Sequence, residues 1–315
     1  MLNVPFNRIG FPELAARIEL GLKGWGHMGL NFPNLGTGVG LRSVHYKHVL
    51  EHRPKVDWFE VISENFMGLS NTEGGQPLRN LEKFRALYPV VLHGVSLSIG
   101  SVDPLNVKYL HRLKELAEHI QPAWISDHLC WTGVGGENLH DLLPLPYTQE
   151  TLTHLIPRIQ QVQEFLKRPL VLENVSSYVS YSHSEMSEWE FLSALAKASG
   201  CGLLVDVNNI YVSAFNHRFD PEEFLRGIPA DHVAQFHLAG HANRGTHLID
   251  THDHAVAQPV WDLYASALEK FGPKSTLIEW DENIPDFDVL MNEAKKAQAI
   301  QKLPRERKNE TTVTV

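Results

Sequence analysis

The stretch VAQFHLAGHANRGTHLIDTHDH, residues 233–254, joins a short apolar run to a polar segment and contains five histidines and two aspartates in all. The run Val233–Leu238 has the composition of a buried β-strand, and His237 stands near its end. Thirteen residues after His237 comes Asp250, and His252 follows two positions later, where an extended backbone directs both side chains to one side. Imidazoles and carboxylates together suit iron, zinc or manganese. The stretch therefore indicates a strand that leads into a metal site; a histidine-rich surface loop is the alternative.

Working outward, the same kind of apolar, β-branched run recurs along the chain and alternates with helical patterns, which is typical of parallel strands joined by helices. The eight runs are Val39–Arg42, Trp58–Ser63, Val90–His93, Trp124–His128, Leu170–Glu173, Leu203–Val207, Val233–Leu238 and Thr276–Glu279. Eight such pairs in order predict an α/β protein, a (β/α)8 TIM barrel. A doubly wound open sheet is the alternative, but no glycine-rich nucleotide fingerprint follows the first strand.

Cap signals mark several of the intervening helices. Asp103 and Pro104 predict an N-cap and a first helical residue, and Asp220 with Pro221 predicts another helix start. Pro157 lies inside a helical pattern, so we expect that helix to kink or to form two pieces.

Length and composition suit one large domain. The 315 residues, 43% of them hydrophobic, match the size of a single α/β barrel. We expect one barrel domain over residues 1–303, with an irregular glycine- and proline-rich lead-in over residues 1–37, and a disordered tail over residues 304–315.

Charge and cysteine usage exclude several classes of protein. A formal net charge of -9 argues against a nucleic-acid partner, because such binding draws on Lys and Arg. Cys130 and Cys201 are too few for a disulfide framework, which favours a reducing cytoplasm. The chain shows neither a signal-peptide pattern nor an apolar run long enough for a membrane span. We therefore expect a cytoplasmic protein without a membrane partner.

Polar residues collect at the ends of the predicted strands, where barrel active sites are built. The candidates are His93, Asp127, His128, Glu173, Asn174, Asp206, Asn208, Asn209, His237, Asp250, His252, Asp253 and Glu279. Each alone has an ordinary explanation, such as a hydrogen-bonded core histidine or a buried ion pair. Together they would be costly to desolvate without cations, and their number exceeds the needs of one metal. The set therefore predicts two or three metal ions a few ångströms apart.

Roles within this set follow from donor chemistry. Glu173, Asp206 and Glu279 are the natural bridges, because a carboxylate has two oxygens. The absence of cysteine from this set of candidates leaves non-heme iron, manganese or catalytic zinc. Asp127 and Asp253 each stand beside a candidate ligand, which suggests an orienting partner or a proton acceptor, although a purely structural role fits Asp127 equally well.

The segments GVGLRSVH, FEVISENF, LHGVSLSIG, ISDHL, LENV, VDVNN, FHLAGH, DTHD and IEWD together resemble one family. The chain is similar, from Gly38 to Glu279, to the multinuclear non-heme iron-dependent oxidases that include the methanobactin biosynthesis oxidase. The resemblance implies a xylose-isomerase-like barrel that holds two or three irons in a mixed-valent state. It also implies dioxygen as co-substrate, oxidation of cysteine residues in a ribosomally made precursor peptide for natural-product biosynthesis, and a small partner protein that presents the peptide.

The resemblance also implies a ligand set. Carried over residue by residue, it consists of His93, His128, Glu173, Asp206, Asn209, His237, Asp250, His252 and Glu279. The related trinuclear zinc endonucleases would have histidine at Asn209, which favours the oxidase. The alternatives are a divalent-metal-dependent phosphodiesterase or endonuclease, a sugar isomerase on the same barrel, and a metal-storage protein without catalytic activity.

Overall fold

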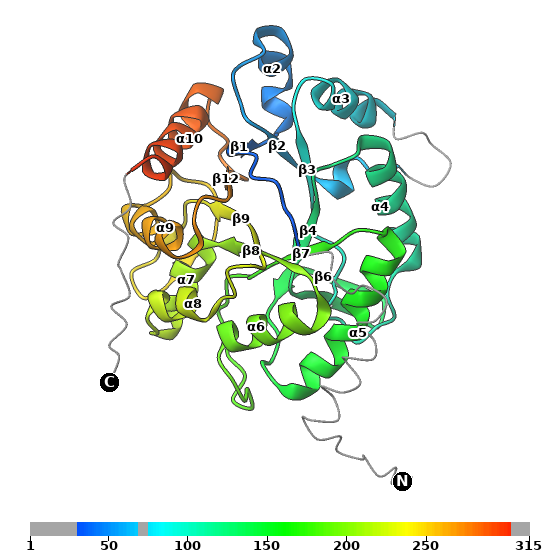
Figure 1. Ribbon diagram of the computed structural model, residues 1–315, viewed down its shortest axis with the longest axis vertical. Helices are drawn as coiled ribbons and strands as arrows, with labels where there is room; N and C mark the ends of the chain where they lie inside the picture. The colour runs from blue at the N-terminus through cyan, green and yellow to red at the C-terminus, as the bar shows by residue number, and fades with distance from the viewer. Residues whose placement is uncertain (1–29, 69–74, 304–315) are drawn as a thin grey trace, which may run out of the picture. The chain divides into compact units, whose positions relative to one another are not determined.

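The computed structural model describes residues 30–68 and 75–303, and the structural statements below concern that part of the chain. Within it, eight parallel strands close into a barrel in the order β1-β12-β9-β8-β7-β4-β3-β2 (Figure 1). These strands are β1 (Thr37–Gly40), β2 (Phe59–Ile62), β3 (Val90–Gly94), β4 (Ile125–His128), β7 (Leu170–Glu173), β8 (Gly202–Asp206), β9 (Val233–Leu238) and β12 (Ser275–Ile278). The predicted TIM barrel is confirmed, and every predicted run coincides with a barrel strand to within two residues.

Helices surround the barrel in Figure 1 and follow the strands in turn. They are α2 (Tyr46–His52), α3 (Gly75–Arg85), α4 (Val107–Ile120), α5 (Gln149–Leu166), α6 (Glu188–Ser199), α7 (Val207–His217), α8 (Pro221–Gly227), α9 (Gln258–Phe271) and α10 (Phe287–Gln301). The short 3-10 turns η2 (Ser43–His45) and η3 (Ser63–Asn65) follow β1 and β2. Among the described residues, no helix combines the length and apolar character that a bilayer span requires.

The helix caps differ from the prediction at one place. Asp220 caps α8 as expected, and its side chain accepts from the amide of Glu222. Helix α4, however, begins after Asn106, so the prediction of Asp103 as its cap was wrong. The Asp103 carboxylate instead accepts from the amides of Gly135 and Gly136 in a neighbouring hairpin, one amide at each of its two oxygens. Helix α5 runs unbroken through Pro157, so it does not form two pieces.

Elements that the sequence patterns did not reveal extend two of the loops. A hairpin of β5 (Trp131–Val134) and β6 (Glu137–Leu143) lies between β4 and α5. A second, shorter pair, β10 (Ala242–Asn243) and β11 (Leu248–Ile249), follows β9. Of the predicted lead-in, residues 30–36 contain no regular element, while residues 1–29 and the tail from residue 304 lie outside the described residues.

An apolar layer fills the barrel interior toward the amino-terminal ends of its strands. It consists of Trp58, Val91, Trp124, Val171, Leu204, Ala234 and Leu277, one from each of seven strand segments, with Phe32 and Leu35 packed against it. Because side chains alternate along a strand, the next residue to point inward lies two positions further along. This apolar layer therefore supports a second layer at the carboxyl ends of the strands, and that second layer is polar.

Candidate metal centre

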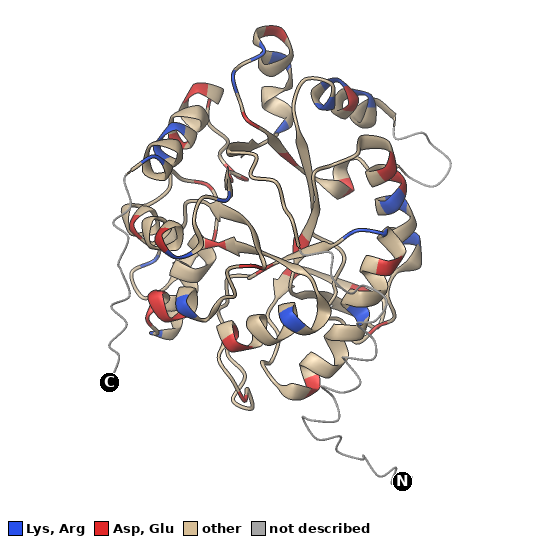
Figure 2. Ribbon diagram, in the orientation of Figure 1, with Lys and Arg blue, Asp and Glu red and all other residues tan. Residues whose placement is uncertain are grey.

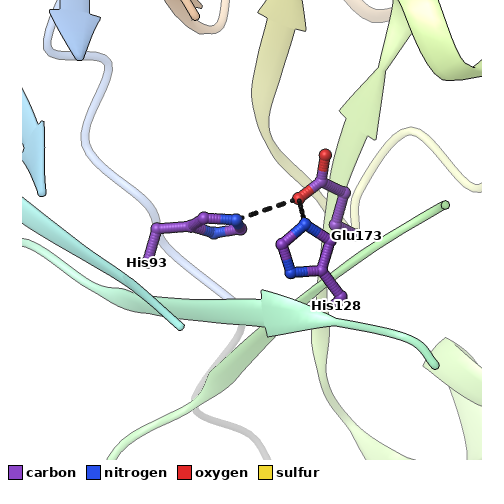
Figure 3. Close-up of side chains that lie close together, drawn as sticks. All are labelled: His93, His128 and Glu173. Atoms are coloured by element: carbon purple, nitrogen blue, oxygen red, sulfur yellow. Dashed lines mark ion pairs between the residues drawn. The ribbon is translucent and has the colours of Figure 1, made fainter. Parts of the chain in front are cut away.

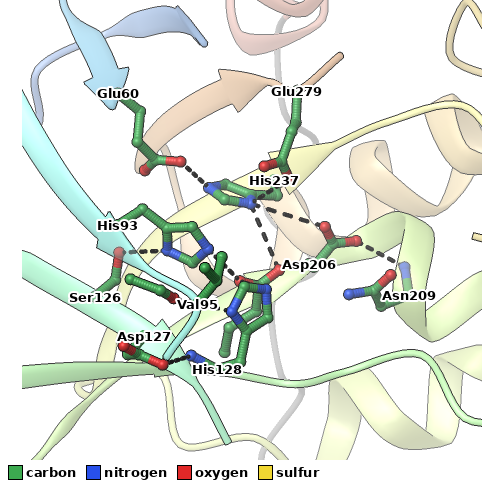
Figure 4. Close-up of polar contacts among 12 residues, drawn as sticks. Glu60, His93, Val95, Ser126, Asp127, His128, Asp206, Asn209, His237 and Glu279 are labelled. Carbon is green, nitrogen blue, oxygen red and sulfur yellow. Dashed lines mark hydrogen bonds and ion pairs between the residues drawn. The ribbon is translucent and has the colours of Figure 1, made fainter. Parts of the chain in front are cut away.

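The polar layer is built by strand alternation above the apolar one. Val91 is followed two positions later by His93, Val171 by Glu173 and Leu277 by Glu279. The buried polar side chains of this layer are Glu60, His93, Ser126, His128, Glu173, Asp206, Gln235, His237 and Glu279. Figure 4 shows all of them except Glu173 and Gln235 with labels. Barrel closure therefore brings together residues that are far apart in the chain.

The first group consists of His93, His128 and Glu173 (Figure 3). Oε2 of Glu173 lies 3.2 Å from Nε2 of His93 and 3.3 Å from Nε2 of His128. The other ring nitrogens face acceptors, since Nδ1 of His93 is 2.8 Å from Oγ of Ser126 and Nδ1 of His128 is 3.0 Å from the carbonyl of Gly94. With protons on both Nδ1 atoms, two Nε2 lone pairs would face a carboxylate. A cation between them would turn this repulsion into coordination.

A second group shares Glu173 with the first and adds Asp206, His237 and Glu279. Nδ1 of His237 lies 3.0 Å from Oε2 of Glu279, 3.5 Å from Oε1 of Glu173 and 3.8 Å from Oδ2 of Asp206. One imidazole nitrogen is thus surrounded by three carboxylates, and all four residues are buried. This is a donor set that suits a divalent ion.

The third group shares Glu279 with the second and consists of His252, Glu279 and Asp281. Nδ1 of His252 lies 3.3 Å from Oε2 of Glu279 and 3.4 Å from Oδ2 of Asp281, while its Nε2 lies 2.7 Å from Oδ1 of Asp250. Asp250 and His252 therefore meet as predicted, but not on an extended backbone, because His252 has a φ of 47°. Its loop is held by backbone hydrogen bonds, from the amide of His252 to Gly240 and from the amide of Asp281 to His252.

The best sign that these groups fit metal ions is a set of buried polar atoms without a hydrogen-bond partner. They include Nε2 of His93, Oε2 of Glu173, Oδ2 of Asp206, Oδ1 of Asn209, Nδ1 of His237 and Nε2 of His252. Buried polar atoms are almost always paired, so six such atoms that converge on one place need an explanation. Each is a lone-pair donor, and metal ions would satisfy all of them.

The pKa values in this centre show how strongly its charges interact. Burial, reinforced by Glu173, raises the pKa of Asp206 well above its usual value. For Glu279 burial acts in the same direction, but His237 and His252 hold its pKa well below the ordinary range. Burial alone would lower the pKa of His237, yet Glu60 and Glu279 raise it well above that of a free histidine. The low pKa of Glu279 therefore depends on nearby positive charge, which bound cations would also supply.

Asn209 is placed by the start of α7. Asp206 caps this helix, and its Oδ1 accepts from the amide of Asn209 at 2.6 Å. In the Asn209 side chain, Nδ2 donates to the backbone carbonyl of Asn174, so the side-chain oxygen Oδ1 is the atom left without a partner. Asn209 lines the same cavity as His93, His128, His252 and Glu279.

The two predicted orienting acids lie apart from these groups. Asp127 neighbours the inward-facing His128 on β4, and its carboxylate accepts from the amides of His128 and Leu97 and from the hydroxyl of Tyr109. Burial, aided by Glu64, raises its pKa to about 8. Asp253 contacts Thr251 and His254 within its own loop. Neither carboxylate contacts a ring nitrogen of a predicted ligand.

Three neighbours of the centre were not assigned a role from the sequence. Glu60 lies 3.0 Å from Nε2 of His237, and Asp281 belongs to the third group. Arg42 forms an ion pair with Asp281 and lies 3.8 Å from Oε1 of Glu279. Two signals were available: Glu60 stands two positions after the inward-facing Trp58, and Asp281 two positions after Glu279. No sequence signal was available for the ion pair between Arg42 and Asp281, because these residues are 239 positions apart.

A cavity of about 290 Å³ opens onto the centre. Its wall includes Asp141 and Leu142 from the β5–β6 hairpin and Tyr178 from the loop after β7. The Tyr178 hydroxyl accepts from the amide of Asp250, which fixes the ring beside the third group. A small molecule or a peptide side chain has room to reach the three groups from outside.

The fold and the buried clusters define a xylose-isomerase-like TIM barrel with a candidate metal centre at the carboxyl ends of its strands. Solved structures share the barrel. L-ribulose 3-epimerase aligns over 84% of this chain and 92% of its own with a TM-score of 0.54 and 15% identity. D-psicose 3-epimerase from Clostridium cellulolyticum H10 aligns over 84% and 98% with a TM-score of 0.53 and 12% identity. At such identities the likeness concerns the fold alone.

Sequence comparison then gives the family. Residues 36–302 match the profile of the RiPP precursor modification enzymes MbnB/TglH/ChrH, and the chain belongs to this family. The UPF0276 protein of Anaeromyxobacter sp. (strain Fw109-5) is 55% identical over 267 residues, 85% of this chain and 93% of that protein. The UPF0276 protein of Caulobacter vibrioides (strain NA1000 / CB15N) is 51% identical over 265 residues, which are 84% of this chain and 93% of that protein. The resemblance found in the sequence motifs is thus confirmed, and the chain is an enzyme.

Proposed function

We propose that this enzyme is a dioxygen-dependent oxidase with two or three non-heme irons that modifies cysteine residues of a ribosomally made precursor peptide. The observation that carries the proposal is the convergence of unpartnered donor atoms on three groups that share Glu173 and Glu279. Shared carboxylates suit neighbouring ions, because each oxygen can serve a different one. Membership of a family of precursor-modifying enzymes supports a peptide as the substrate.

In this proposal His93, His128 and Glu173 would hold one ion, and Glu173, Asp206, His237 and Glu279 a second. His252 and Asp250, which meet at Nε2 of His252, would hold a third, with Asn209 as a weak neutral donor near Asp206. Bound iron would supply what the side chains lack, namely thiolate binding and dioxygen activation. In a mixed-valent pair, one ion would serve for thiolate binding and the other for dioxygen activation.

The chain's own residues orient the ligands and shape access. Ser126 and the carbonyl of Gly94 keep protons on Nδ1 of His93 and His128, so that both Nε2 lone pairs face the centre. Leu142, Val175 and Tyr178 line the cavity and would restrict water around an entering cysteine. The peptide would come from a small presenting partner protein. Cys130 and Cys201 are both free and buried, which fits a reducing cytoplasm as the place of action.

The first test is metal content. Protein from an iron-replete culture, purified without chelators, is expected to hold two or three ions, at least partly iron, and anomalous diffraction should place them at Glu173 and Glu279. Dioxygen consumption is then measured with cysteine-containing precursor peptides and with matched peptides in which serine replaces cysteine. Loss of the signal with serine is expected.

The alternative is a hydrolase or sugar isomerase with the same ligands, and the likeness to sugar epimerases makes it worth a direct assay. Zinc alone after iron-replete expression, with no cysteine-dependent oxygen uptake, would favour this alternative. A well-ordered centre without any metal would contradict both activities.

A further inference from the structure

Glu60 lies beside the deepest histidine of the centre without belonging to any of the three groups. It points inward from β2, two positions after Trp58 of the apolar layer, and is 3% exposed. Its Oε1 is 3.0 Å from Nε2 of His237, on the opposite side of the ring from the carboxylates of the second group (Figure 4).

A second side chain contacts the same ring nitrogen. The amide nitrogen of Gln235 lies 2.7 Å from Nε2 of His237 and also donates to Oε2 of Glu60 at 2.7 Å. The orientation of this amide is set by Trp124, whose indole N–H donates to Oε1 of Gln235. Gln235 therefore presents its N–H₂ group, and cannot present its carbonyl, to His237.

These two neighbours favour opposite tautomers of His237. A carboxylate only accepts, so Glu60 requires a proton on Nε2. The Gln235 N–H₂ group only donates, so it favours a bare Nε2 and a proton on Nδ1. A proton on Nδ1 would occupy the nitrogen that faces Glu173, Asp206 and Glu279.

We propose that Glu60 is a positioning residue that selects the Nε2–H tautomer of His237 and so keeps its Nδ1 lone pair free for a metal ion. A bare Nε2 would place its lone pair against a buried carboxylate, which is repulsive, whereas Nε2–H makes a charge-assisted hydrogen bond. Gln235 then acts by donating to the second oxygen of Glu60. The inference rests on the proposed metal centre, in which Nδ1 of His237 is a ligand, and it goes beyond the ligand set.

The test uses Zn²⁺ as a diamagnetic probe on the full chain. Zinc affinity and stoichiometry are measured by chelator competition for the wild type, Glu60→Leu and Glu60→Gln. We expect one zinc to bind about 10- to 100-fold more weakly in Glu60→Leu, with a smaller loss in Glu60→Gln, whose amide oxygen can still accept. The matched control is Glu293→Gln on α10, another buried glutamate that accepts from a backbone amide, and it should bind zinc like the wild type.

Two further readouts separate tautomer selection from simple packing. In ¹⁵N-histidine spectra, with His237 assigned by its loss in His237→Gln, the zinc-loaded wild type should show Nε2–H, and Glu60→Leu should show Nδ1–H. Removing the competing donor in Glu60→Leu/Gln235→Met should restore part of the lost affinity. Circular dichroism and thermal melting confirm folding, and Glu60→Gln serves if Glu60→Leu does not fold.

Wild-type affinity in both Glu60 variants, or an unchanged His237 tautomer in Glu60→Leu, would overturn the inference while leaving the metal centre intact. A wild type that binds no zinc or iron would instead remove the metal centre, and this inference with it. A protein that binds zinc but lacks oxidase activity still tests Glu60, because neither readout depends on turnover.

Discussion

Oε2 of Glu173 lies 3.2 Å from Nε2 of His93, although the two residues belong to strands that are not neighbours in the barrel. The strand between them, β4, supplies His128, whose Nε2 lies 3.3 Å from the same oxygen. Three strand ends thus converge on one carboxylate oxygen that has no hydrogen-bond partner. The other oxygen of Glu173 faces His237, so this glutamate joins two of the candidate metal groups.

Replacing Glu173 should therefore affect more than one ion. We expect Glu173→Gln, which keeps the shape but removes the charge, to weaken metal binding by about 100-fold or more and to abolish the proposed oxidase activity. Metal analysis after gel filtration measures the effect, with Glu118→Gln on the exposed side of α4 as the control. Full metal content in Glu173→Gln would argue against bridging by this residue.

Arg42 holds a positive charge at the third group. Burial acts to lower its pKa, but Asp281 and Glu279 raise it, so the guanidinium stays charged beside two candidate ligands. Because it repels an incoming cation, Arg42→Gln should tighten metal binding at this group roughly tenfold, while Arg42→Lys should change it little. Competition titrations with Zn²⁺ measure this. Weaker binding in Arg42→Gln would mean that Arg42 serves mainly to orient Asp281.

A substitution at Gly38 on β1 would show how closely the apolar layer of the barrel is packed. A Cβ at this position would lie 2.5 Å from the indole ring of Trp58 and 2.7 Å from its carbonyl oxygen, which belongs to the backbone just before β2. Gly38→Ala should lower the free energy of unfolding by about 1–3 kcal/mol or more. Urea unfolding measures it against Leu139→Ala, a change at an exposed position on β6. Equal stability of the two variants would show that the barrel can shift to admit a methyl group.

Glu188, the first residue of α6, predicts a pH dependence of stability. Burial raises its pKa from 4.5 to about 8, although a hydrogen bond from Tyr147 acts in the opposite direction. Between these two pH values the folded state keeps a proton that the unfolded state has lost, so this group lowers the free energy of unfolding as pH rises. Glu188→Gln should therefore gain stability over the wild type at pH 8 but not at pH 4.5. Urea unfolding at both pH values measures the difference in stability between the variant and the wild type. A difference that is the same at both pH values would contradict the raised pKa of Glu188.

Much of the centre could be predicted because one rule, strand alternation, acts on most of the strands. It places His93, Glu173 and Glu279 inward above apolar residues two positions earlier. The same rule explains why Asp127 lies outside the centre, since its neighbour His128 points inward. The sequence motifs alone also identified the family, because they combine strand ends spread over nearly the whole chain.

The sequence by itself therefore determined the barrel, the strands and most of the residues at the centre, since these depend on local periodicity. Only the tertiary structure decided which of those residues meet. A register shift between β8 and β9, where Leu203 pairs with Val233 but Leu204 with Gln235, aligns Asp206 with His237. The Arg42–Asp281 ion pair likewise exists only because the barrel closes between β1 and β12. Register and closure arise from packing between distant strands, and no local pattern in the chain encodes them.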